Sequence, residues 1–286
     1  MSIKPRRSVL YMPGANRRAM DKARTLDCDS IIFDLEDAVA ESAKGEARQA
    51  VAQMIREGGY GYRELIVRVN GLDTPWGSDD IAAMAQLPIA ALLFPKVETA
   101  LQVGDIAAAV DAAGGGSLPL WLMIETPLGV LDVRAVAASS PRIEVLVMGT
   151  SDLVKELRAE HTPERHNIGY ALQHCVLAAR EAGVDILDGV HLDFRNSESF
   201  AAVCAQGKAI GFDGKTLIHP SQIETANATF GFSEDAVVDA RAVMAVWQEA
   251  QAAGKGVAVL DGRLIENLHA AEAERVLAFS AALSER

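Results

Sequence analysis

The chain has 286 residues, of which 50% are hydrophobic and 23% are charged, a composition that supports a buried core and argues against disorder. Its formal charge of −12 disfavours nucleic-acid binding, because phosphate backbones select basic protein faces. No apolar run is long enough to cross a bilayer, and the 3 cysteines form no C-x-x-C pair. We therefore expect no signal peptide, membrane anchor, disulfide framework or zinc knuckle, and a cytoplasmic location.

Short aliphatic or β-branched runs alternate with helical patterns along the chain. The runs predict strands near residues 7–12, 30–36, 64–70, 90–94, 119–125, 143–149, 184–191 and 209–218. The intervening patterns predict helices near residues 16–27, 42–58, 77–86, 98–113, 130–138, 168–182 and 197–207. This alternation indicates βαβ units with a parallel sheet, and eight strands are the number that closes a barrel. We expect an α/β fold, with a TIM (β/α)₈ barrel over residues 1–222.

Residues 223–286 fall outside the barrel repeat and predict a C-terminal helical extension. Helices are expected near 220–228, over 234–253 and from about residue 268, with the apolar piece GVAVLDGRLIE between the last two. This extension could cap its own barrel or pack on a neighbouring subunit.

Two acids follow apolar runs at matched places, Glu125 in WLMIETPLGV and Asp152 in VLVMGTSDLV. Adjacent strands lie about 4.8 Å apart, so both side chains can point to one spot at the carboxyl-terminal face of a barrel. Two close carboxylates require a proton or a cation, and Mg²⁺ accepts one or two protein carboxylates. We interpret the pair as metal ligands. Helix N-capping is the alternative for either acid taken singly, most seriously for Asp152.

Other polar residues fall at or just past predicted strand ends, and we expect them to form one ring at the barrel mouth. They are Glu36, Asp37, Arg68, Asn70, Lys96, Asp188, His191, Lys215 and His219. A salt bridge between Asp37 and Arg68 is the simple alternative to a catalytic role for Asp37.

Seven motifs, in chain order, resemble the citrate lyase beta subunit and related CoA ester lyases of the HpcH/HpaI aldolase superfamily. They are RSVLYMPGANRRAMDKA, IIFDLEDAVA, VRVNGLDT, LLFPKVE, MIETPLGV, MGTSDL and GFDGKTLIHPSQI. The resemblance runs from about residue 6 to residue 223 and continues weakly into the tail. It implies a Mg²⁺-dependent carbon–carbon lyase on a TIM-like barrel, a CoA thioester substrate, and a homotrimer or dimer of trimers.

The resemblance also implies roles for particular residues. The metal-binding acids of the family match Glu125 and Asp152, its active-site arginine matches Arg68, and a substrate-holding arginine at the amino terminus matches Arg7. An acid that transfers a proton at the α-carbon of the thioester matches Asp261 in VAVLDGRLIENLH. This tail departs from the family pattern, since ENLH stands where a proline commonly precedes the histidine.

These residues suggest retro-Claisen or retro-aldol cleavage of a 3-hydroxyacyl-CoA thioester into a 2-oxo acid and an acyl-CoA. The metal would chelate the carboxylate and hydroxyl oxygens of the substrate, and Arg68 would stabilise the developing oxyanion. Glu36 and Asp37 would orient the water on the metal, and Asp261 would protonate the enolate. Arg7, Arg68 and Glu125 are the expected substrate contacts.

Several alternatives remain open from the sequence. A Schiff-base aldolase would use Lys96 or Lys215 at a strand end. A citrate lyase beta subunit would act on citryl-acyl carrier protein, and a non-catalytic barrel would serve assembly or sensing. Thioester hydrolysis could follow cleavage at the same metal, and malyl-CoA, methylmalyl-CoA, citramalyl-CoA and citryl thioesters are all candidate substrates.

Overall fold

A computed structural model describes residues 3–286 of the chain. It divides into two compact units, one formed by Arg6–Phe230 and the other by Gly231–Arg286 together with residues 3–5. Each unit has its own apolar core, so we describe them separately.

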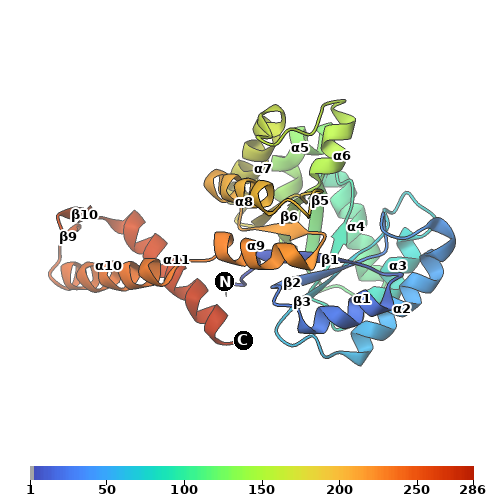
Figure 1. The fold of residues 1–286 in the computed structure, drawn as a ribbon, viewed down its shortest axis with the longest axis horizontal. Helices are drawn as coiled ribbons and strands as arrows, with labels where there is room; N and C mark the ends of the chain where they lie inside the picture. The colour runs from blue at the N-terminus through green and yellow to red at the C-terminus, as the bar shows by residue number, and fades with distance from the viewer. Residues whose placement is uncertain (1–2) are drawn as a thin grey trace. The chain divides into compact units, whose positions relative to one another are not determined.

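The first unit is a closed barrel of eight parallel strands in sequential order, surrounded by helices (Figure 1). The strands are β1 (Ser8–Pro13), β2 (Ser30–Asp34), β3 (Glu64–Arg68), β4 (Ala91–Phe94), β5 (Leu120–Ile124), β6 (Ile143–Met148), β7 (Asp185–Asp188) and β8 (Gly214–Leu217). The helices are α1 (Arg17–Lys22), α2 (Lys44–Glu57), α3 (Gly77–Met84), α4 (Ala100–Ala112), α5 (Pro127–Ala137), α6 (Thr150–Glu156), α7 (Gly169–Ala182), α8 (Ser197–Ile210) and α9 (Ile223–Phe230). Short 3₁₀ turns are η1 (Ala23–Thr25), η2 (Glu41–Ala43), η3 (His166–Ile168) and η4 (Pro220–Gln222).

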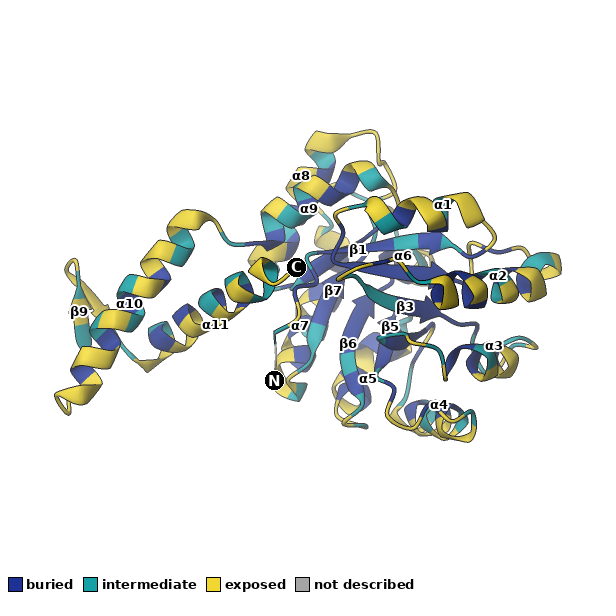
Figure 2. Ribbon diagram, turned by 90° about the horizontal axis from the view of Figure 1, so that it is seen from below, coloured by how far each residue is buried: buried dark blue, intermediate teal, exposed yellow. Residues whose placement is uncertain are grey.

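The strands are buried on both faces, as parallel strands between a barrel interior and a helical layer must be (Figure 2). Alternate side chains point to opposite faces of a strand, so each strand contributes to two clusters. On β5, Trp121 and Met123 belong to the interior cluster, whereas Leu120 and Leu122 pack under the helices. The predicted TIM barrel is confirmed, with every predicted strand present and shifted by a few residues at its ends.

Two features of this unit differ from the sequence-based expectation. The helix α6 was not predicted. Its only buried apolar residues are Leu153 and Val154, which are too few to give the repeating apolar pattern of a helix. The boundary between the units falls after Phe230 rather than at residue 222, because α9 packs against α8, β1 and β8 and so belongs to the barrel.

The amino-terminal ends of the strands are joined by ion pairs around Arg6, which is 4% exposed. Its guanidinium contacts Glu64 at 2.8 Å, and also pairs with Glu144 and Asp185 from two further strands. The same guanidinium lies 5.1 Å from the ring centroid of Trp121 at the floor of the interior. Residues at this face of a TIM barrel serve stability, whereas the opposite face carries the chemistry.

The second unit is an antiparallel pair of helices with a small hairpin. It contains α10 (Glu234–Ala252), β9 (Ala258–Leu260), β10 (Arg263–Ile265) and α11 (Asn267–Ser284). Its core is built around Trp247, Ile265 and Val276. Within residues 3–286, no helix is both long enough and apolar enough to cross a membrane.

Candidate active site

A cavity of about 350 Å³ lies at the carboxyl-terminal ends of the barrel strands. Residues at or just beyond the ends of β1, β2, β3, β5, β6 and β8 line it, which places it where barrel enzymes hold their ligands. The lining residues are Tyr11, Pro13, Asp34, Asp37, Ala38, Arg68, Met123, Glu125, Met148, Gly149, Thr150, Ser151, Asp152, Val190, Thr216 and Ile218.

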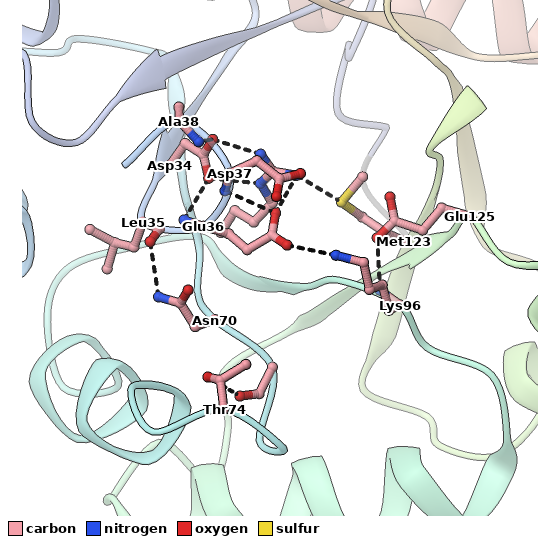
Figure 3. Close-up of polar contacts among 12 residues, drawn as sticks. Asp34, Leu35, Glu36, Asp37, Ala38, Asn70, Thr74, Lys96, Met123 and Glu125 are labelled. Atoms are coloured by element: carbon pink, nitrogen blue, oxygen red, sulfur yellow. Dashed lines mark hydrogen bonds and ion pairs between the residues drawn. The ribbon is translucent and has the colours of Figure 1, made fainter. Parts of the chain in front are cut away.

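Arg68 is held at one wall of the cavity by carboxylates from the last residue of β2 and from the loop that follows. Figure 3 shows these carboxylates, Asp34, Glu36 and Asp37. Its Nε and Nη2 donate to the two oxygens of Asp34 at 2.7 and 2.6 Å, a bidentate pairing. Its Nη1 lies 2.9 Å from Glu36 Oε2 and 3.7 Å from Asp37 Oδ2. Burial alone would lower the pKa of Arg68, but the facing Asp34 and Glu36 raise it well above its ordinary value, so the guanidinium stays cationic.

Lys96 connects this arginine cluster to Glu125. Its Nζ lies 3.0 Å from Glu36 Oε1, and its backbone N–H donates to Glu125 Oε1 at 2.8 Å. The backbone of Lys96 has a φ of 51°, a left-handed conformation that residues other than glycine rarely adopt. The end of β4 therefore orients one oxygen of Glu125 through the main chain.

Glu125 is a buried acid, and only one of its two carboxylate oxygens is hydrogen-bonded within residues 3–286. It is 1% exposed, and its Oε2 has no hydrogen-bond partner among residues 3–286. Burial raises its pKa to about 7, against the opposing effects of the Lys96 N–H and of Arg68. A Cβ on Gly149 would stand 2.2 Å from this Oε2, so only glycine leaves room for the carboxylate.

The capping alternative does not account for either acid. Helix α5 is capped by Thr126, whose side chain accepts from the Gly129 N–H, and not by Glu125. The N-cap of α6 is Gly149, and Asp152 lies in the first turn with its side chain at the cavity. Both acids thus face the same space, from the end of β5 and from the helix that follows β6.

The donor set fits a divalent cation. Five acids, Asp34, Glu36, Asp37, Glu125 and Asp152, face two cations, Arg68 and Lys96, which leaves three negative charges in excess when all are ionised. In the described part of the chain, no group of three or more His, Cys, Asp or Glu side chains is gathered as a metal site. A pair of carboxylates with one unpartnered buried oxygen suits Mg²⁺, which keeps most of its ligands as water or substrate oxygens.

The pKa of Glu125 predicts a pH dependence of Mg²⁺ affinity. Because this pKa is raised to about 7, a proton competes with the metal below that pH. We expect the affinity to fall about tenfold per pH unit below pH 7 and to level off above it. In the metal-free protein the raised pKa favours folding at low pH, and that contribution is lost as pH rises through 7. Calorimetric Mg²⁺ titrations between pH 5.5 and 8.5 measure this, and a constant affinity would contradict it.

The predicted site residues Arg7 and Asp261 are not among the residues that line the barrel cavity. Arg7 precedes β1 and pairs with Asp29 through its Nη2 at 2.8 Å, at the amino-terminal end of the strand. The structure therefore does not bring Arg7 to this cavity, whose β1 residues are Tyr11 and Pro13. Asp261 is exposed between β9 and β10 in the second unit, with a φ of 50°, and its role stays a prediction.

The two lysines of the Schiff-base alternative do not line the cavity. Lys96 is paired with Glu36, as described above. Lys215 is 0% exposed and shares the outward face of β8 with Leu217, under the helices. Its Nζ lies 2.7 Å from Asp188, which is equally buried. The expected ring of polar side chains is therefore incomplete, since Asp188 and Lys215 point away from the mouth.

The sequence analysis overlooked two residues of the site. Asp34, the bidentate partner of Arg68, lies in the same IIFDLEDAVA motif as Glu36 and Asp37. Asp34 lies two positions after Ile32, which faces the barrel interior, and residues two apart on a strand point to the same side. This spacing could have indicated that Asp34 faces inward. Tyr11 lines the cavity, and its apolar surroundings in RSVLYMPG carried no such signal.

Comparison with known proteins places this architecture in a family. The sequence model of the HpcH/HpaI aldolase/citrate lyase family matches residues 7–220. The chain belongs to this family. It is 47% identical over 280 residues to a (3S)-malyl-CoA thioesterase of Cereibacter sphaeroides, with 98% of this chain and 96% of that protein covered. It is 35% identical over 267 residues to the citrate lyase subunit beta of Escherichia coli K12, covering 91% of this chain and 88% of that one.

A solved structure with bound ligands is similar to this chain. CitE of Mycobacterium tuberculosis, in complex with magnesium, acetoacetate and coenzyme A, is similar with a TM-score of 0.76 and 26% identity. The similarity covers 96% of this chain and 97% of that one. The sequence resemblance to the citrate lyase beta subunit and its relatives is thus confirmed.

Proposed function

We propose that this chain is a Mg²⁺-dependent enzyme acting on a malyl-type CoA thioester, and that its net reaction is hydrolysis to the free acid and CoA. Such a substrate is a 3-hydroxyacyl thioester with a carboxylate on its hydroxyl carbon. The observation that carries the proposal is the buried, unpartnered Oε2 of Glu125 facing the same cavity as Asp152. The relatives named (3S)-malyl-CoA thioesterase, at 45–47% identity, support the substrate and the hydrolysis.

Glu125 and Asp152 would hold the metal, and Gly149 leaves the space that the Glu125 carboxylate needs. When bound, Mg²⁺ supplies Lewis acidity and a template for the carboxylate and hydroxyl oxygens of the substrate. The excess of acids around the cavity makes this cation necessary for an anionic substrate, because the side chains alone would repel it.

Arg68 would stabilise negative charge on the reacting acyl group. Asp34 and Glu36 hold its planar guanidinium by three of its donors, so its position is set before the substrate arrives. Preorganised donors of this kind lower the barrier because they need no reorganisation when charge develops. In hydrolysis, water adds to the thioester carbonyl, the C–S bond breaks, and CoA leaves as a thiol after taking a proton.

Carbon–carbon cleavage is the second candidate, favoured by the match to the citrate lyase beta subunits at 33–35% identity. The substrate hydroxyl loses its proton, the C–C bond breaks, and its electron pair remains on the acyl-CoA as an enolate. A 2-oxo acid leaves, and the enolate carbon takes up a proton. We propose Asp261 as the acid, supplied by its own chain or by a neighbour in a cytoplasmic homo-oligomer.

The two reactions are separated by their products. Purified protein is incubated with Mg²⁺ and (3S)-malyl-CoA, and free thiol and glyoxylate are measured in the same samples. Hydrolysis releases thiol without glyoxylate, and cleavage releases glyoxylate without thiol. Citramalyl, methylmalyl and citryl thioesters, including citryl-acyl carrier protein, define the acyl preference. Neither product from any thioester, or full activity in EDTA, would contradict the proposal and favour a non-catalytic barrel.

A further inference from the structure

Tyr11 is a residue of the cavity without an assigned role. Val9 and Tyr11 pack on the interior cluster of the barrel, whereas Leu10 and Met12 lie on its outer face. Tyr11 is also one of the cavity residues. Its ring therefore separates the apolar interior from the polar cavity, with the hydroxyl available at the boundary.

The hydroxyl of Tyr11 has a poor partner. Among residues 3–286, it makes its hydrogen bond to the sulfur of Met123, at 3.7 Å. A thioether is a weak acceptor, so the described part of the protein gives the hydroxyl of this half-buried side chain only a weak hydrogen-bond partner. A phenylalanine would fill the same space without the hydroxyl. The presence of the hydroxyl therefore needs an explanation. An oxygen atom of a ligand inside the cavity would give it a stronger hydrogen-bond acceptor.

The surroundings keep this hydroxyl protonated and place it beside a cation. Burial raises the pKa of Tyr11 well above its ordinary value, although Arg68 opposes this effect. The Arg68 guanidinium lies 4.9 Å from the centroid of the Tyr11 ring, and its Nη1 also contacts Met123. A neutral O–H donor and a permanent cation thus stand side by side at the cavity wall.

We propose that the Tyr11 hydroxyl donates a hydrogen bond to the thioester carbonyl oxygen of the substrate, next to Arg68, as negative charge develops there. This inference rests on the proposed function. In hydrolysis the carbonyl electron pair moves to this oxygen when water adds, and returns when the C–S bond breaks. In C–C cleavage the electron pair of the broken bond is delocalised onto the same oxygen in the enolate. Tyr11 keeps its proton in both reactions.

The single-atom variant Tyr11→Phe tests this role. Removing one donor from a developing oxyanion typically lowers kcat about 10²- to 10³-fold. We expect a loss of about a hundredfold in kcat with KM changed by less than about threefold, because the bond strengthens in the transition state. Mg²⁺ affinity and melting temperature should stay near those of the wild type. A kcat/KM within about threefold of the wild type would overturn the proposal.

Tyr60→Phe is the matched control. Tyr60 is 3% exposed, and its hydroxyl donates to the Met20 carbonyl, outside the cavity lining. This variant loses the same atom and should keep full kcat. If it lost activity as Tyr11→Phe does, the effect would be structural and the proposal would fail.

A binding measurement separates this inference from the proposed function. A dethia analogue of acetyl-CoA, in which a CH2–COO− group replaces the S–CO–CH3 group, carries a carboxylate carbon where acetyl-CoA has its carbonyl carbon, and so mimics the charge of the enolate. With Mg²⁺ present, calorimetry should give a Kd about tenfold higher for Tyr11→Phe than for the wild type. If the wild type turned over no thioester, the proposed function would fail, whereas equal Kd values in the two proteins would overturn the role of Tyr11.

Discussion

Replacing Glu125 by glutamine should abolish Mg²⁺-dependent turnover, with a loss of at least about a thousandfold in kcat/KM, equivalent to about 4 kcal/mol of transition-state stabilisation. The variant keeps the size of the side chain and the acceptor for the Lys96 N–H. It replaces the unpartnered Oε2 by an amide nitrogen or leaves a neutral oxygen there, and in either case removes the charge that a metal needs.

The same variant should not harm the fold. The carboxylate is 1% exposed and its pKa is raised to about 7, so the metal-free protein holds an unfavourable buried charge at neutral pH. We expect the melting temperature without metal to stay equal or to rise. Turnover, Mg²⁺ calorimetry and thermal melting are measured together, with Glu181→Gln at an exposed Arg134 pair as the control. Retained Mg²⁺ binding in Glu125→Gln would remove the basis of the proposed function.

Replacing Asp188 by asparagine should destabilise the barrel by about 3 to 5 kcal/mol, since it leaves buried cations without their partner. Lys215 lies 2.7 Å from Asp188, and Arg165 donates to it at 2.7 Å from the segment before η3. Burial alone would raise the pKa of Asp188, but Lys215 and Arg165 lower it, so the side chain is an anion in the folded protein.

Urea unfolding measures this loss, and two further variants define its cause. Asp188→Asn combined with Lys215→Met removes both charges of the pair and should recover part of the stability, because an apolar replacement needs no partner. Asp239→Asn, at the half-exposed pair with Arg263, should leave the unfolding midpoint of the barrel unchanged. An equal stability of Asp188→Asn and wild type would show that the buried cations find other partners.

Much of the fold followed from local patterns. Each barrel strand is a short apolar run bounded by turn residues, and such runs are visible without knowledge of their neighbours. Glu125 and Asp152 were correctly predicted to lie at one cavity, because the carboxyl-terminal ends of all strands in a parallel barrel meet at one face. A polar residue that follows a predicted strand is therefore expected at that face. Helix α6 escaped prediction because it is short and begins directly at the turn after β6.

Orientation across a strand was harder to predict than position along it. Asp188 ends β7 as the sequence suggested, whereas Lys215 lies beside it near the start of β8. Both side chains face the helical layer, because a shift of one residue along a strand reverses the side of the sheet to which a side chain points. Asp34 and Arg68 face inward by the same rule and pair with each other. Lys96 was expected at the rim, but the left-handed turn that sends its N–H to Glu125 is a property of the folded loop.

The sequence by itself determined the barrel and the acids at the carboxyl-terminal face, because hydrophobic periodicity and strand order act locally along the chain. Its motifs, by their resemblance to known proteins, indicated the family. Only the tertiary structure decided that Glu125 keeps one buried oxygen unpartnered, that Asp34 anchors Arg68, and that Tyr11 stands beside this cation. These contacts join residues from different strands, and their geometry depends on barrel closure and on the packing of side chains that are distant in sequence.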